Sequence, residues 1–141
     1  MAAGGKGGAK TAAAPARPAR DGLGVAIVCL VSWLVPGAGH LQLGRREKGL
    51  VFLIALPVMF GIGLYLGGRL FPFAWSEPLV ALAAVADLGA GLWYVAARFA
   101  GYGGGQVVAV TYEYGNTFLI VAGLLNFLVM LDAFDIALGR K

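Results

Sequence analysis

Charged residues are scarce in this sequence. Only 13% of its 141 residues are Asp, Glu, Lys or Arg, whereas 60% are hydrophobic. Soluble domains carry about 25% charged residues, so the chain lacks about half of the charged surface that water requires. The composition excludes an ordinary water-soluble protein, and the length leaves room for one folded domain.

The residues that build disulfides and metal sites are almost absent. Cys29 is the only cysteine and His40 the only histidine. A single cysteine excludes an internal disulfide, and a structural zinc site needs four such ligands. Because neither a nucleophile–base pair nor a metal cluster can be assembled, we expect no enzymatic activity, no metal and no cofactor. We also expect no nucleic-acid partner.

Large apolar side chains are missing from residues 2–20, which consist mainly of Ala, Gly, Pro, Lys and Arg. Such a segment cannot bury enough surface to offset its ordering entropy, so we predict that residues 1–21 form a disordered basic tail. Its cations either rest on anionic lipid or stay solvated and help to set the orientation of the chain. A cleaved signal peptide is the alternative, which the long leader and the proline at position 36 argue against.

Four apolar segments follow the tail and predict an all-α integral membrane bundle. We expect four hydrophobic helices within a membrane domain of residues 22–141, at about residues 23–43, 49–67, 79–99 and 117–138. A helix needs about 20 apolar residues to cross a bilayer, and the first uninterrupted run is too short. It spans only if the helix continues through Pro36, where proline and the following Gly37 favour a kink or a break.

This short first segment leaves two topologies open. If all four segments cross, with both termini inside, the inner side holds seven of the eleven lysines and arginines. If the first segment is re-entrant, the inner side holds eight of the eleven. The positive-inside rule favours the second arrangement slightly, whereas helix continuity favours the first. We expect four spans.

A polar elbow, residues 36–49, separates the first two segments and reads PGAGHLQLGRREKG. Its glycines allow a tight turn and a close approach of two helices. Arg45, Arg46 and Lys48 should then lie at the depth of the lipid headgroups, where anionic phosphates neutralise them. His40 lies beside them, and we expect it to bond a nearby carbonyl group. A pH switch is the alternative role for this histidine.

The elbow resembles the paired-transmembrane-helix domain of bacterial and animal membrane proteins, through its Pro-Gly-x-Gly-His, Leu-Gly-Arg-Arg and Lys-Gly motifs. That resemblance covers residues 23–66. The remainder, especially YEYGNTF at 112–118 and the stretch from Gly123 to Asp135, resembles a bacterial membrane protein family of unknown function with a similar elbow. The resemblance implies a helical fold in the bacterial cytoplasmic membrane, and it implies no catalytic residue or substrate.

Asp87 lies near the middle of the third apolar segment, and Asn126 near the middle of the fourth. A charged carboxylate at the bilayer centre costs about 2.5–3.5 kcal/mol on insertion scales. Antiparallel neighbours would bring the two residues to the same depth, so we predict that Asp87 bonds Asn126 or a neighbouring helix. Such a pair either holds helices together or takes part in a proton or ion relay.

Further candidates lie at helix ends and on faces of small residues. Asp132 and Asp135 are interfacial acids that can pair with Arg69, or with Arg140 and Lys141. Small residues let helices pack closely in a membrane. The candidate packing positions are Gly63, Gly67, Ala83, Gly91 and Gly123.

Two functions remain open on this sequence. The first is a non-enzymatic multi-pass protein that packs with a second copy or with another membrane protein, as a scaffold or accessory subunit. The second is a small proton- or ion-coupled transporter or channel component that uses Asp87 and Asn126.

Overall fold

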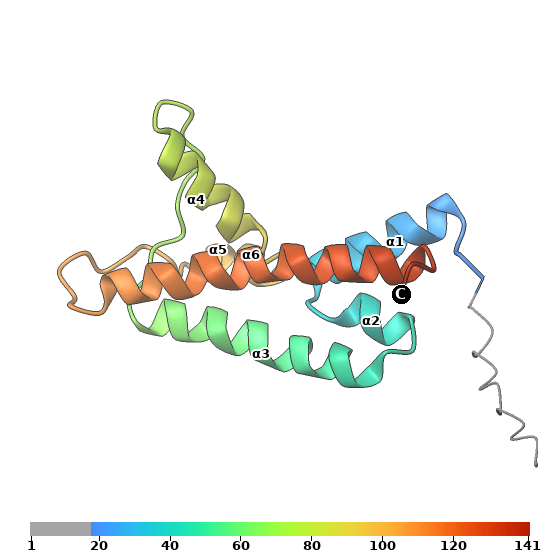
Figure 1. Cartoon of the computed structure of the whole chain (residues 1–141). Helices are drawn as coiled ribbons and strands as arrows, with labels where there is room; N and C mark the ends of the chain where they lie inside the picture. The colour runs from blue at the N-terminus through green and yellow to red at the C-terminus, as the bar shows by residue number, and fades with distance from the viewer. Residues whose placement is uncertain (1–17) are drawn as a thin grey trace, which may run out of the picture.

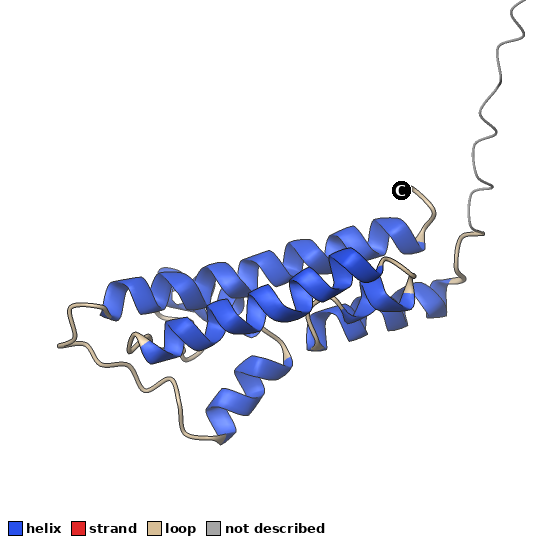
Figure 2. Ribbon diagram, turned by 90° about the horizontal axis from the view of Figure 1, so that it is seen from below, coloured by secondary structure: helices blue, strands red, loops and turns tan. Residues whose placement is uncertain are grey.

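The computed structural model describes residues 18–141, and their regular structure is α-helical (Figures 1 and 2). The helices of this part are α1 (Gly22–Leu34), α2 (Ala38–Gln42), α3 (Arg46–Tyr65), α4 (Pro78–Leu88), α5 (Leu92–Phe99) and α6 (Tyr112–Ala137). The predicted all-α class is confirmed. Most of the tail predicted to be disordered lies outside the described residues.

Helices α3 and α6 form the frame of the molecule and run side by side along most of their lengths (Figure 1). With 20 and 26 residues, both are long and apolar enough to cross a membrane. Helix α3 continues through Pro57 without interruption. Helix α6 begins at Tyr112, earlier than the predicted start at residue 117. The two helices approach closely because Gly115 of α6 faces the backbone of Gly63 and Gly68.

The first predicted helix, residues 23–43, is broken into α1 and α2. Asp21 caps α1 by accepting a hydrogen bond from the Gly24 amide at 3.1 Å. The helix ends before Pro36, as the steric demand of proline on the preceding residue predicts. Gly37 has a φ of 82°, a left-handed conformation that turns the chain back.

After this turn, α2 brings the chain back to the end of the molecule at which α1 begins. The Arg20 side chain, just before α1, donates to the Gln42 carbonyl at the end of α2. The Arg20 amide donates to the Ala137 carbonyl of α6 at 3.1 Å. The start of α1, the elbow and the C-terminal residues therefore share one end of the molecule, here called the elbow end.

The third predicted helix, residues 79–99, is also broken, which corrects the sequence prediction. Helices α4 and α5 are bent by 105° at a short break. Gly91, at this break, has a φ of 63°, which favours glycine. After α5 the chain meets the segment that follows α3, because the Leu70 amide donates to Gly103 and the Gln106 amide to Gly67. The segment that follows α3 and the segment that follows α5 thus lie together at the opposite end of the molecule, here called the far end.

The two broken pairs lie beside different halves of α6. Val25 and Val28 of α1 form one core cluster with Ala133 in the C-terminal half of α6. Ala97 of α5 shares a second cluster with Leu119 in the N-terminal half. Helix α4 touches α6 near its own C-terminal end and otherwise projects from the bundle (Figure 1).

Neither topology considered from the sequence has this arrangement. Four spans would separate the elbow from the start of α1, but Arg20 contacts Gln42. A single re-entrant segment would separate the N-terminal and C-terminal ends, but Arg20 also contacts Ala137. The structure differs from both topologies because the chain turns back at the break between α1 and α2 and at the break between α4 and α5.

Candidate functional site: buried polar side chains and a basic pocket at the elbow end

Asn126 joins the two breaks at the middle of the bundle. Its side chain is fully buried, and its Nδ2 donates to the Trp33 carbonyl at 2.9 Å and to the Gly89 carbonyl at 2.8 Å. Trp33 lies at the end of α1, and Gly89 follows α4. Carbonyl groups at helix C-terminal ends lack partners within the helix, so Asn126 satisfies two of them in an apolar environment.

Asp87 is also fully buried, but it does not bond Asn126. One carboxylate oxygen, Oδ2, accepts a hydrogen bond from the Phe71 amide at 2.9 Å. Instead of one pair, Asp87 and Asn126 each form their own hydrogen bonds with backbone groups. In the part of the chain that the structure describes, Asp87 Oδ1 and Asn126 Oδ1 are buried without a hydrogen-bond partner.

A second polar cluster joins three helices at the elbow end. Asp132 of α6 accepts from buried His40 of α2 across 3.0 Å, where the expected partner of the histidine was a carbonyl group. Lys48 of α3 lies 3.5 Å from the same carboxylate, and Lys141 contacts its other oxygen. This hydrogen bond to Asp132 raises the pKa of the Lys141 ammonium group. The edge of the His40 ring packs against Phe52, with the ring centres 5.2 Å apart.

The remaining interfacial acid pairs locally. Asp135 forms an ion pair of 3.5 Å with Arg140. The Arg140 side chain is largely exposed and that of Asp135 partly exposed, and such a surface pair contributes between 0 and about 1 kcal/mol. Of the two sets of partners considered for the acids, the structure places Arg140 and Lys141 beside them, whereas Arg69 lies at the far end.

The predicted packing positions have different roles. A Cβ on Gly63 would meet Leu119 of α6, and one on Gly123 would meet the Ala86 carbonyl of α4. These two glycines are therefore contact points within the chain. Gly67 and Gly91 are turn residues with φ values of 84° and 63°. Ala83 is half-buried on α4.

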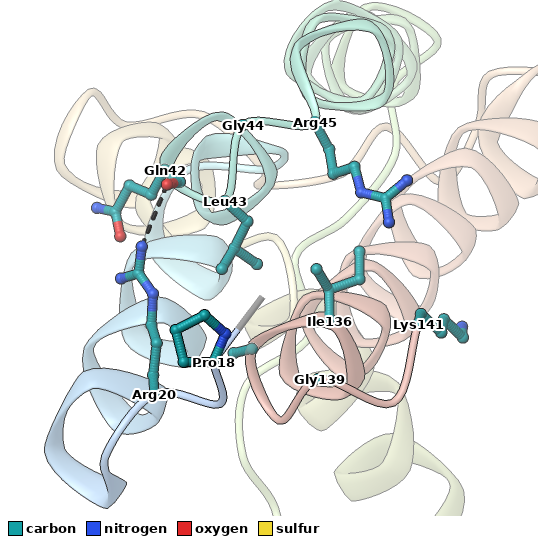
Figure 3. A pocket seen from close by; sticks show the side chains of 10 residues that line it. Pro18, Arg20, Gln42, Leu43, Gly44, Arg45, Ile136, Gly139 and Lys141 are labelled. Atoms are coloured by element: carbon teal, nitrogen blue, oxygen red, sulfur yellow. Dashed lines mark hydrogen bonds between the residues drawn. The ribbon is translucent and has the colours of Figure 1, made fainter. Parts of the chain in front are cut away.

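The elbow end also contains an open pocket of about 540 Å³ (Figure 3). Its basic side chains are Arg20, Arg45 and Lys141, and its floor includes Leu43 and Ile136. Arg20 precedes α1, Arg45 precedes α3 and Lys141 follows α6, so three separate segments supply the charge. The neighbouring Arg46 is exposed and does not line the pocket.

Sequence reasoning missed the role of two residues. Asn116 lies inside α6, and its Oδ1 accepts from the Arg69 amide at 2.7 Å, a contact that the sequence did not predict. Arg20 was assigned to the tail, whereas it binds the elbow. Asn116 precedes the apolar segment that was expected to begin at residue 117, so the pattern that identified Asn126 did not include it.

Within residues 18–141 no group of three or more His, Cys, Asp and Glu residues is placed to hold a metal ion. No curated protein and no solved structure matched the chain in the comparisons. A family of unknown function, DUF6677, matched residues 27–141, a range that begins within α1 and contains the elbow, α4, α5 and both long helices. This match covers most of the chain, which therefore belongs to the DUF6677 family.

Proposed function

We propose that the protein is a non-enzymatic scaffold or accessory subunit of an assembly in the bacterial cytoplasmic membrane. The observation that supports this role is how the buried polar groups are used. Asn126, Asn116 and Asp87 each bond backbone groups of a neighbouring segment. These contacts hold one arrangement of the helices together, as a scaffold requires.

The proposed partner surface is helix α4. The predicted packing glycines Gly63 and Gly123 are already covered by residues of the same chain. Helix α4, in contrast, projects from the bundle and exposes Leu79 by 82% and Leu82 by 66% (Figure 1). Such a helix offers a side-by-side contact to a transmembrane helix of another membrane protein.

Crosslinking in native membranes tests this proposal. Cysteine at position 82, in a Cys29→Ala background, should crosslink to another membrane protein through a short bifunctional maleimide. Cysteine at position 54 of α3 is the matched control, because Ile54 is 62% exposed on a helix that already packs along α6. Equal crosslinking at both positions, or a product that contains only this chain, would contradict the proposal.

A proton- or ion-coupled transporter is the second candidate. It is favoured by the two buried oxygens without partners, on Asp87 and Asn126, next to the breaks of two helix pairs. Interrupted helices with polar groups at mid-depth are common at the binding sites of transporters. The replacement Asp87→Asn distinguishes the two functions.

A further inference from the structure

The pocket at the elbow end concentrates positive charge that the other described residues neutralise only in part. Its lining side chains include two arginines and one lysine, and no acid. Lys141 is paired with Asp132, so Arg20 and Arg45 carry the uncompensated charge. Among the described residues, the guanidinium of Arg45 has no hydrogen bond or ion pair, and that of Arg20 donates to Gln42.

We propose that this pocket binds a phosphate group, carried by an anionic membrane lipid. A guanidinium presents five N–H donors in a planar fork that matches phosphate oxygens two at a time. Arg20 and Arg45 reach the pocket from the segments before α1 and α3 (Figure 3). A bound phosphate would therefore connect the start of the described chain to the elbow. This site is independent of the proposed scaffold role.

A neighbouring groove indicates that the phosphate belongs to a lipid. The groove lies between α3 and α6, has a volume of about 300 Å³ and is lined almost entirely by apolar side chains. It extends from Met59 and Leu125 to Asp132 at the elbow end. Ile136, one helical turn beyond Asp132 on the same face of α6, already lines the basic pocket. An acyl chain in the groove would thus place its headgroup near Arg45.

Retention of lipids by the purified full-length protein tests the site. Native mass spectrometry in detergent should show more bound phosphatidylglycerol than phosphatidylcholine. Arg45→Gln should weaken phosphatidylglycerol binding by about tenfold, the effect of losing one charge-assisted hydrogen bond. Arg20→Gln should have a similar effect, which guards against a folding defect of either single variant.

Arg46→Gln is the matched control, since Arg46 is adjacent, equally charged and outside the pocket. It should leave phosphatidylglycerol binding unchanged. Equal losses in the Arg45 and Arg46 variants would show a diffuse surface charge effect and overturn the proposal. Equal retention of phosphatidylcholine and phosphatidylglycerol by the unaltered protein would also overturn it.

Competition with inorganic phosphate distinguishes a lipid headgroup from free phosphate as the natural ligand of the pocket. If a lipid is the source, millimolar phosphate should not displace phosphatidylglycerol, because free phosphate lacks the acyl chain that fills the groove. Displacement that depends on Arg20 and Arg45 would support the phosphate site and overturn the lipid as its natural source.

Discussion

At the scale of single residues, the buried polar side chains of the bundle form hydrogen bonds with backbone groups. Asn126 donates to two carbonyl groups, and Asp87 accepts from one amide. Hydrogen-bonding groups without water are costly in hydrocarbon, so each broken helix needs a side chain of this kind near its break. This requirement explains why an acid and an amide persist in otherwise apolar segments.

Asp87→Asn should leave the protein folded, because asparagine keeps an oxygen that accepts from the Phe71 amide. We expect the thermal unfolding free energy in detergent to change by less than about 1 kcal/mol. Proton uptake into proteoliposomes under a pH gradient should not differ from that of the unaltered protein. Loss of proton uptake by a variant that remains folded would support the transporter instead.

The control for this variant is Asp87→Leu. Leucine removes the acceptor and leaves the part-buried Phe71 amide without this partner, which should cost about 1–3 kcal/mol. If both variants had the same stability, the Asp87 contact would not hold the segment that follows α3.

At the scale of elements, glycine decides where helices cross. Gly123 of α6 lies against the backbone of α4 at Ala86 and Gly89, and Gly115 lies against Gly63 and Gly68. Without hydrophobic attraction between helices in lipid, such close backbone contact supplies much of the packing energy.

Gly123→Ala should therefore loosen the contact between α4 and α6. The added Cβ would collide with the Ala86 carbonyl, a backbone atom that cannot turn aside. We expect a loss of about 1–3 kcal/mol in unfolding free energy, measured by thermal unfolding in detergent.

Gly61→Ala provides the matched control in α3, since a Cβ there meets no atom within 4 Å. It should be neutral or stabilise by up to about 1 kcal/mol, because alanine favours helix more than glycine does. Equal destabilisation by both replacements would argue against a close crossing at Gly123.

At the scale of the whole molecule, the fold places most of the described lysines and arginines at one end. Within residues 18–141, the elbow end carries Arg20, Arg45, Arg46, Lys48, Arg140 and Lys141, whereas the far end carries Arg69 and Arg98. By the positive-inside rule, we propose that the elbow end faces the cytoplasm. Over the same eight residues, four spans would give four cations on each side and a single re-entrant segment would give five against three, so the asymmetry of six against two is larger than in either topology.

Cysteine labelling in intact cells tests this topology. In a Cys29→Ala background, cysteine at position 46 should resist an impermeant maleimide, and cysteine at position 108 should react. Both positions are exposed, and Val108 is 99% exposed. Both sequence-based topologies place these two loops on the same side, so same-side labelling would contradict the structure.

Local composition was sufficient to predict several features. The apolar segments predicted an all-α membrane fold, and Pro36 with Gly37 predicted a kink or a break. The two polar residues near the middle of their apolar segments, Asp87 and Asn126, were identified from that depth. What they contact could not be predicted, because their partners are backbone groups at helix ends distant in the sequence.

The sequence by itself determined that this chain belongs in a membrane and that it is helical, because burial of apolar side chains and backbone hydrogen bonding depend on composition and local order. The tertiary structure alone decided that two helix pairs turn back. At the break near Gly91, Asn126 donates to the buried Gly89 carbonyl, which lies 37 residues away in the sequence. The tertiary structure also decided that Arg20, Arg45 and Lys141 line one pocket, since residues from three distant segments meet there only after the chain has folded.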